Sequence, residues 1–138
     1  MNVIRILPLH GIEGLKLGAS ENDVIAWAGE PNEKRLHPDQ DQATTLHYSF
    51  KGQMYGLDSK GNLNFIVIRT GKCAIELWGS IIDHDASGIR NLILKAGFEP
   101  KTNCNSFGDS IEVAEQGLCF CFDTDSGDLE AVQIYPIP

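Results

Sequence analysis

The chain has 138 residues, of which 42% are hydrophobic and 22% are charged, and its formal net charge is −8 at pH 7. A chain of this length and composition fits one globular domain. No stretch reaches the roughly 20 apolar residues of a membrane-spanning helix. The net negative charge argues against nucleic acids and anionic membranes as partners, because both are themselves negatively charged.

The first eight residues form an apolar stretch that Arg5 and Pro8 interrupt. This stretch is too short for the core of a secretory signal peptide, and it predicts a first β-strand instead. Since nothing in the sequence marks the chain for export, we expect it in the cytoplasm.

The rest of the first half predicts a loop at residues 11–18, then one helix and three strands. Ser20 can cap the amino end of a helix that Gly29 ends, and Trp27 lies on its apolar side. We therefore expect Trp27 in the core. The polar segment 32–43 is expected to contain an exposed loop. Alternating apolar residues then predict three strands, at 44–50, 53–57 and 63–69.

The second half predicts the same kinds of element. A helix that carries Ile89 and Ile93 on one face can be capped by one of three residues, Asp83, Asp85 or Ser87. Strands are expected at 74–78, 81–82, 110–115, 118–123 and 129–135, with a strand or loop at 101–107.

The four cysteines are Cys73, Cys104, Cys119 and Cys121. They show neither a Cys-x-x-Cys pair nor the spacing of zinc ligands, so they predict reduced, structural thiols in a reducing compartment. Cys119 and Cys121 alternate with larger apolar residues and share one face of the predicted strand. Apolar side chains on both faces are typical of a strand that is covered on both sides.

An internal repeat relates the two halves. Residues 52–68 recur as 117–134: each copy has a glycine, a short apolar strand ending in Asp, a turn with Gly, and a second strand opened by Leu. Residues 24–31 and 92–100 both end a helix with Ala-Gly before a proline. Self-similarity at this scale predicts the architecture. We expect one α+β domain, residues 1–138, built from two internally duplicated helix-plus-antiparallel-sheet units (about 1–70 and 71–138). The two sheets, with one helix per repeat, would surround a shared core.

Charge is divided unequally between these repeats. Residues 1–70 carry a net charge of −1 and residues 71–138 carry −7, which together give −8. An acidic surface speeds the encounter with a basic partner, although acidity can also serve solubility alone. The predicted partner-binding residues are the acidic side chains on the later strands and turns, namely Asp109, Glu112, Glu115, Asp123, Asp125, Asp128 and Glu130.

Residues 123–130 look at first like a calcium-binding loop, because aspartates recur along them. In an EF-hand loop a glycine stands sixth and a glutamate twelfth, whereas here Gly127 is fifth and Ile134 would be twelfth. The counterpart at 58–62 holds a single aspartate in the same place. Both segments therefore predict hairpin turns, and we expect no metal site.

No set of catalytic residues is evident. The histidines are scattered along the chain, and the two aspartates beside His84 are explained by helix capping. A catalytic nucleophile needs a base and an orienting group that meet it in space, and no local pattern provides them. No glycine-rich phosphate loop is present. We expect a protein that is not an enzyme and uses no cofactor.

A family resemblance rests on two segments, residues 18–31 and residues 117–129. They resemble small immunity proteins of bacterial toxin–immunity systems, including those of contact-dependent growth inhibition and of bacteriocins. In these proteins a capped helix ending in Leu/Ala-Gly-x-Pro precedes a hairpin of the form apolar-Phe-x-Phe-Asp-x-x-Gly-x-Leu. The resemblance implies a cytoplasmic protein that binds a cognate toxin domain. With the acidic charge, we expect a basic nuclease toxin whose active site is occluded.

The alternative function is binding of single-stranded nucleic acid. A duplicated helix-plus-four-strand plan is also similar to whirly-type nucleic-acid-binding proteins. Lys34, Arg35 and Lys51 are the one plausible basic cluster, and Tyr48 and Phe50 lie near them in the sequence. The basic strand motif of whirly-type proteins is missing, which argues against this alternative.

Overall fold

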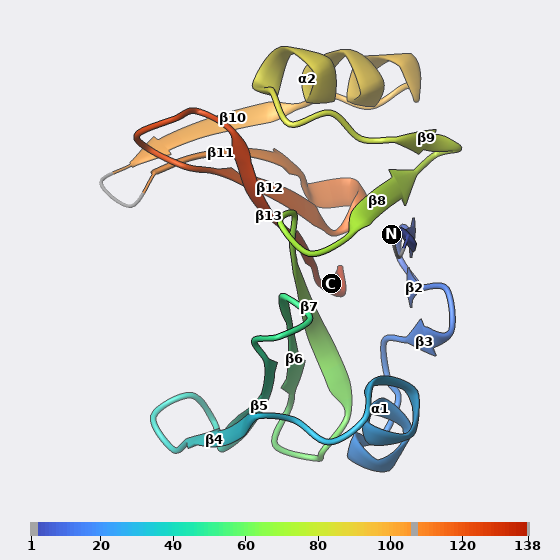
Figure 1. Cartoon of the computed structure of the whole chain (residues 1–138), viewed down its shortest axis with the longest axis vertical. Helices are drawn as coiled ribbons and strands as arrows, with labels where there is room; N and C mark the ends of the chain where they lie inside the picture. Colours follow the sequence, from blue (N-terminus) through green and yellow to red (C-terminus); the bar gives the residue numbers. More distant parts are fainter. Residues whose placement is uncertain (1–2, 106–107, 138) are drawn as a thin grey trace.

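The structure, a computed structural model, describes residues 3–105 and 108–137 (Figure 1). In this part the chain is a mixed α+β protein with two α-helices, one short 3-10 helix (η1, Ala114–Gln116) and two β-sheets. The predicted fold class, α+β with two sheets and two helices, is therefore confirmed. None of the helices described is long and apolar enough to cross a membrane.

The smaller sheet has five strands in the order β3-β2-β1-β8-β9. Its strands are β1 (Val3–Leu7), β2 (Gly11–Ile12), β3 (Leu15–Lys16), β8 (Ala74–Leu77) and β9 (Ser80–Ile81). Strands β1 and β8 pair in parallel and join the two halves of the chain. The predicted loop at 11–18 thus contains two very short strands, which are too short to give a periodic signal.

The larger sheet has eight antiparallel strands in the order β10-β11-β12-β13-β7-β6-β5-β4. Those of the first half are β4 (Glu33–His37), β5 (Ala43–Tyr48), β6 (Gln53–Leu57) and β7 (Leu63–Arg69). Those of the second half are β10 (Lys101–Asn105), β11 (Gly108–Val113), β12 (Leu118–Phe122) and β13 (Leu129–Ile134). We name β4–β7 the first arm and β10–β13 the second arm.

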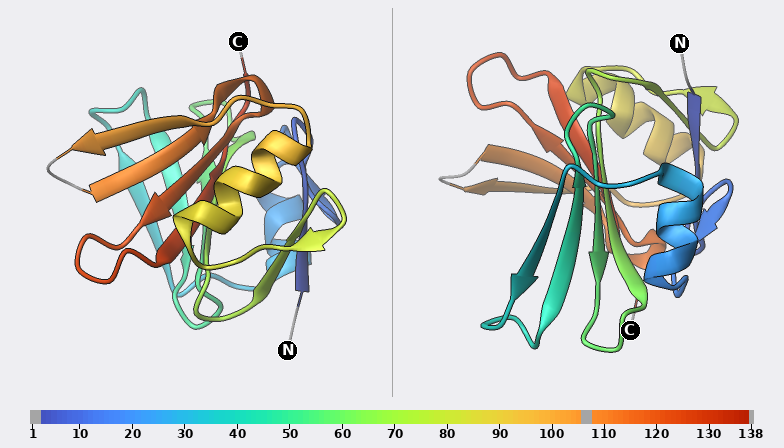
Figure 2. Two further views of the ribbon diagram at one scale, coloured as in Figure 1. Left: turned by 90° about the horizontal axis from the view of Figure 1, so that it is seen from above. Right: turned by 60° about the horizontal axis from the view of Figure 1, so that its bottom comes forward.

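The two arms meet where β7 pairs with β13, and they lie at a large angle to each other (Figure 1). A register shift in each arm, at Gly56/Leu57 and at Cys121/Phe122, adds local twist. Helix α2 lies over the second arm and α1 lies beside the first arm, as the views from other directions also show (Figure 2). One face of the large sheet is therefore covered by helices and the other is open.

Both helices begin where the sequence predicts. Ser20 caps α1 (Glu21–Ala28) by accepting a hydrogen bond of 3.2 Å from the Asp23 N–H, and the Asp23 side chain bonds back to the Ser20 N–H. This reciprocal capping satisfies two backbone donors. Asp85 caps α2 (Ala86–Lys95) by accepting a hydrogen bond of 2.6 Å from Gly88.

Buried side chains from both sheets and both helices form one continuous core. Val24 of α1 and Ile89 of α2 are fully buried in it, as are Tyr55 of β6 and Phe120 of β12. Burying one such apolar side chain contributes about 1.5–3 kcal/mol. The core therefore holds the helix-covered face of the sheet in place and leaves the opposite face exposed.

Two sequence predictions are wrong, and one strand was not predicted. The segment 32–43 does contain an exposed turn, at residues 38–42, but its first part forms β4, which pairs with β5. Most side chains of this edge strand are exposed, so it lacks an apolar pattern. Trp27 is 39% exposed and packs edge-to-face on Tyr55 at the margin of the core. Strand β12 is fully covered on one face only, because Cys119 and Cys121 are half-buried on the open face.

Candidate functional site

The open face of the large sheet carries the main hollow of interest. Strand alternation sends every second side chain of β5, β6, β7, β12 and β13 away from the helices. These side chains surround a hollow of about 720 Å³ that spans both arms, and we name it the sheet groove. Its lining is Arg35, His47, Ser49, Gly52, Gln53, Met54, Phe65, Val67, Arg69, Cys121, Glu130, Ala131 and Gln133.

The floor of the sheet groove is apolar. Val67 and Ala131 are 8% and 6% exposed although no helix covers them, while Met54 and Phe65 are half-buried beside them. Neighbouring side chains of a concave sheet cover one another in this way. The floor is thus apolar surface that a docking group could remove from water, at roughly 25 cal/mol per Å².

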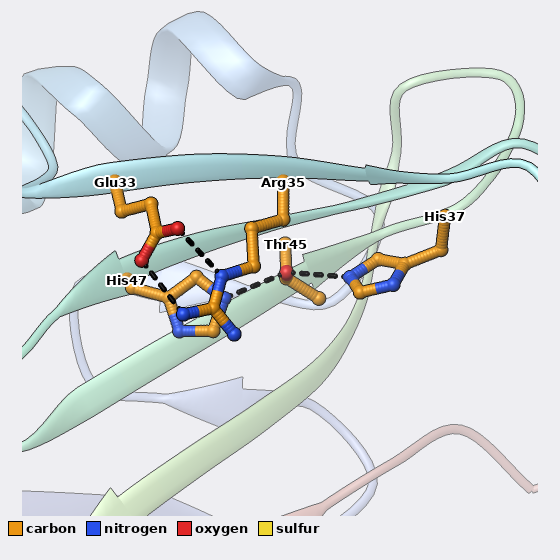
Figure 3. A network of polar contacts seen from close by, with 5 residues as sticks. All are labelled: Glu33, Arg35, His37, Thr45 and His47. Atoms are coloured by element: carbon orange, nitrogen blue, oxygen red, sulfur yellow. Dashed lines mark hydrogen bonds and ion pairs between the residues drawn. The ribbon is translucent and has the colours of Figure 1, made fainter.

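Polar side chains of β4 and β5 form a network at one side of the groove (Figure 3). Arg35 donates two hydrogen bonds to the Glu33 carboxylate, of 2.7 and 2.8 Å. Thr45 Oγ1 lies 2.9 Å from His37 Nε2 and 2.8 Å from His47 Nε2. Since one hydroxyl can donate to one ring and accept from the other, the network fixes both imidazoles.

Charge and burial in this network shift two pKa values. The hydrogen bonds from Arg35, helped by its charge, lower the pKa of Glu33. Burial, followed by the positive charge of Arg35, lowers the pKa of His47, and Glu33 opposes that shift. The network therefore gives the groove one polar side whose side chains are fixed by hydrogen bonds, and its charges and burial favour the neutral form of His47.

On the side away from this network, residues of both arms line the groove. Arg69 of β7 lies 3.5 Å from the Glu130 carboxylate of β13, and both side chains are largely exposed. A second hollow, of about 400 Å³, adjoins this ion pair and is lined by Lys72, Asp123 and Asp128 among others. The groove thus has an acidic border on the side of the β12–β13 hairpin.

The predicted partner-binding acids fall into two groups. Asp109 pairs in register with Phe122, next to the hairpin that carries Asp123, Asp125, Asp128 and Glu130. The other two, Glu112 and Glu115, lie toward the opposite end of β11 and in η1. Glu112 accepts a hydrogen bond of 2.8 Å from Tyr135. The structure therefore places Asp123, Asp128 and Glu130 along the groove or the hollow that adjoins it. Asp109 lies on the opposite face of the sheet, because it stands directly across from the buried Phe122.

In the β12–β13 hairpin the carboxylate of Asp123 stabilises the turn. Asp123 Oδ1 accepts hydrogen bonds from the backbone N–H groups of Asp125 and Ser126, which lower the pKa of Asp123. Asp58 does the same for Lys60 and Asn62 in the counterpart hairpin. The prediction of two hairpin turns is confirmed.

The predicted basic cluster is engaged within the protein. Lys34 pairs with Glu21 at 3.0 Å, Arg35 binds Glu33, and the Lys51 ammonium donates to the Ala28 carbonyl. Lys51 also lies 5.7 Å from the centre of the Phe50 ring. These contacts leave little free positive charge beside the aromatic side chains.

Sequence reasoning missed the groove itself. His47 lies on the face of β5 opposite Leu46 and Tyr48, but its meeting with His37 depends on the pairing of β4 with β5. The alternation of Glu33, Arg35 and His37 could have indicated one polar face of a strand. In the described residues no cluster of three or more His, Cys, Asp or Glu side chains could hold a metal ion.

Comparisons with known proteins identify a shared fold. Neither the protein-family models nor the curated proteins match this chain. A solved structure described as an extracellular protein containing a SCP domain, from Bacillus anthracis str. Ames, is similar with a TM-score of 0.58 and 11% identity. The similarity covers 87% of this chain and 44% of that protein, so this chain spans less than half its length. At this identity the likeness concerns the fold alone.

The groove therefore has the features of a binding surface: a curved sheet, an apolar floor, a fixed polar wall and a charged border. Interfaces between proteins combine an apolar centre with a polar rim in the same way.

Proposed function

We propose that this chain is an immunity protein that binds a cognate bacterial toxin domain with its sheet groove. The observation that carries the proposal is the open, apolar-floored groove across both arms of the large sheet. A rigid concave sheet can accept a convex segment of another protein without rearranging, which lowers the entropic cost of binding. Occlusion of the toxin active site would need no catalytic residue in this chain.

Charge supports a basic toxin, such as a nuclease. The net charge is −8, and Asp123, Asp128 and Glu130 of the β12–β13 hairpin line the groove or the hollow that adjoins it. Such a border attracts a surface that normally contacts phosphates, and it raises the association rate. The acidic residues would guide the encounter, while the apolar floor would supply the buried contact.

The test is co-production with a candidate toxin, namely the variable C-terminal domain of a large secreted protein encoded directly upstream. We expect restored growth and a dissociation constant on the order of nanomolar, or about −12 kcal/mol. Absence of binding to any such domain would contradict the proposal. Binding of single-stranded DNA at moderate salt would favour the alternative function instead.

A matched pair of variants locates the interface. Met54 is half-buried in the groove, whereas Leu94 is 53% exposed on the outer face of α2. We expect Met54→Arg to weaken toxin binding about 100-fold or more, because a charge would replace part of the apolar centre. Leu94→Arg should leave the affinity unchanged. Equal effects of both variants would place the interface elsewhere.

We further propose that the two halves are copies of one duplicated unit. Supporting it, each helix is followed by four antiparallel strands, and the strand order of the large sheet is mirrored about the β13–β7 pair. The register shifts also fall at matching positions, Leu57 and Phe122, before the two hairpin turns. An experimental structure should superpose residues 17–70 on 83–136 by a pseudo-twofold rotation. Unrelated helix packing in the two segments would refute the duplication.

A cytoplasmic location belongs to the same proposal, because an immunity protein protects the cell that makes the toxin. Fractionation of the producing cells tests it: the chain should follow cytoplasmic markers. The structure from Bacillus anthracis is described as that of an extracellular protein. Recovery of this chain from the culture medium would contradict the cytoplasmic location.

A further inference from the structure

A third hollow, of about 360 Å³, lies where α1, β1 and the turn between β5 and β6 come together. Its lining includes the apolar and aromatic side chains of Val3, Trp27 and Phe50 and the lysines Lys51 and Lys72. We name it the aromatic hollow. With the lining of the sheet groove it shares one residue, Gln53 of β6.

Exposed apolar side chains gather at this hollow. In the described part of the chain eight large apolar side chains are exposed, and Val3, Trp27 and Phe50 are three of them. Their exposed fractions are 55%, 39% and 57%. Single exposed apolar residues are common on protein surfaces, but several around one hollow are typical of a binding site. A ligand in the aromatic hollow would therefore remove apolar surface from water.

The two exposed aromatic rings rest on buried tyrosines. Trp27 packs edge-to-face on Tyr55 with ring centres 6.2 Å apart, and Phe50 packs in the same way on Tyr48 at 6.4 Å. Tyr48 and Tyr55 are fully buried and contact each other at 5.5 Å. The Trp27 indole also lies so close to Gly14 that a Cβ there would be 2.3 Å from Nε1. Because both rings are supported in this way, a ligand that stacks on them orders few side chains.

The charged residues that line the aromatic hollow are both lysines. Lys72 is not part of the basic cluster discussed above, and it forms no ion pair among the described residues. The Lys51 ammonium is held 2.5 Å from the Ala28 carbonyl and 5.7 Å from the centre of the Phe50 ring. An ammonium has three N–H donors, so this contact positions Lys51 and leaves donors for a ligand. With no carboxylate in the described lining, the aromatic hollow favours an anionic group.

We propose that the aromatic hollow binds a small planar aromatic ligand that carries one carboxylate or phosphate group. The ring packs against Trp27 and Phe50, and the anionic group accepts hydrogen bonds from Lys72 and Lys51. A volume of about 360 Å³ is near the lower end for small-molecule sites, which fits a ligand of one or two rings. The proposal does not depend on the toxin, because the aromatic hollow and the sheet groove have only Gln53 in common.

Four probes that differ in ring and charge test the proposal by calorimetric titration. 1-Naphthoate and 1-naphthyl phosphate carry both features, 1-naphthalenemethanol lacks the charge, and cyclohexanecarboxylate lacks the aromatic ring. For the tighter of the two charged naphthalenes we expect a dissociation constant on the order of 100 μM, and at least about tenfold weaker binding of the two incomplete probes. The tighter of the two also identifies the anionic group. Equal binding of the neutral ring, or no binding of either charged naphthalene at about 1 mM, would overturn the proposal.

Matched variants locate the bound probe. Phe50→Ala should weaken binding about tenfold or more, and Lys72→Gln should weaken it several-fold and flatten its salt dependence. The controls are Leu36→Ala, at a side chain that is 58% exposed on β4, and Lys60→Gln, on the exposed turn between β6 and β7. Both controls should leave the dissociation constant unchanged, and all four variants should keep the melting temperature.

Two further results would contradict the proposal. Equal effects of the control variants and of Phe50→Ala and Lys72→Gln would show that the probe binds elsewhere. Displacement of the probe by single-stranded DNA at moderate salt would assign the aromatic hollow to nucleic-acid binding, the alternative function. Loss of toxin binding in Phe50→Ala is not expected, since Phe50 does not line the sheet groove.

Discussion

The two halves of the molecule use their charges differently. In residues 1–70 three of the acidic side chains form ion pairs with basic residues of the same half, namely Glu13 with Arg5, Glu21 with Lys34 and Glu33 with Arg35. In residues 71–138 only Glu76 and Glu130 take part in ion pairs within the described part of the chain, and both pair with arginines of the first half.

This difference affects the long-range electrostatic field of the protein more than its free energy of unfolding. Ion pairs at the surface contribute little to folding, but each one cancels the field of its carboxylate. The first half has a net charge of only −1, while Asp123, Asp125 and Asp128 of the acidic second half form no ion pair among the described residues. Similar local structure in the two halves thus comes with a different outer surface, and the second half is the one suited to attract a basic partner.

The largest expected difference between the halves is the stability cost of replacing one backbone glycine in each. Gly52 and Gly117 precede equivalent strands with φ of 70° and 63°. A Cβ at Gly117 would overlap the backbone carbonyl of Tyr135, whereas one at Gly52 would lie 2.9 Å from the mobile Cγ of Lys72. We expect Gly117→Ala to cost about 3 kcal/mol and Gly52→Ala about 1 kcal/mol, measured by urea unfolding. Equal costs would show that the two positions are constrained alike.

The charge comparison itself is tested by two matched sets of four substitutions to Asn or Gln. One set changes Asp109, Glu115, Asp125 and Asp128, and the other changes Glu13, Glu21, Glu30 and Glu33. The second-half set should slow association with the toxin about tenfold and flatten its salt dependence, because free charges guide the encounter. Stopped-flow association at several salt concentrations measures this. A larger effect of the first-half set would place the interface on the other half.

A smaller effect is expected from the histidine network, which only the first arm has. Because the pKa of His47 is lowered in the folded protein, the unfolded chain binds more protons near and below its ordinary pKa of about 6.5. The stability should therefore fall as the pH drops from 7 to 5. His47→Gln should reduce this fall by less than about 1 kcal/mol, since solvent screens the half-exposed ring. A pH dependence unchanged by the substitution would mean that other groups cause it.

Calcium should have no effect on either hairpin. The side chains of Asp58 and Asp123 make equivalent hydrogen bonds to their turns, which leaves neither free to lead a calcium site. We expect no shift in the melting temperature on adding calcium and no heat in a calorimetric titration. Calcium binding with micromolar affinity at the Asp123–Asp128 hairpin alone would show that the two turns are not equivalent.

Local signals in the sequence were sufficient for most elements. The strands β6 and β7 begin and end at the predicted residues, and Ser20 and Asp85 cap the two helices as capping chemistry suggests. Strand β4 was missed because an edge strand with exposed side chains has no apolar period. Trp27 was misplaced because a short helix with a weak apolar face leaves its outer residues at the margin of the core.

The candidate site was predicted less well than the fold. The acidic residues of the second half were identified from charge alone, and three of the seven, Asp123, Asp128 and Glu130, line the groove or the hollow beside it. The groove lining was not predicted, because its members come from six strands and one turn and none is unusual by itself. Composition can identify a charged half of a chain, but it does not say which face of a sheet stays uncovered.

The sequence by itself determined the helices, the hairpin turns and the alternation that gives each strand a buried and an exposed face. These features depend on backbone preferences and side-chain spacing within a few residues. Only the tertiary structure decided that β13 pairs with β7, and that Cys121 and Arg69 thereby line one groove across the two arms. Pairing between distant strands uses backbone hydrogen bonds that every residue except proline can make, so no local residue pattern specifies it.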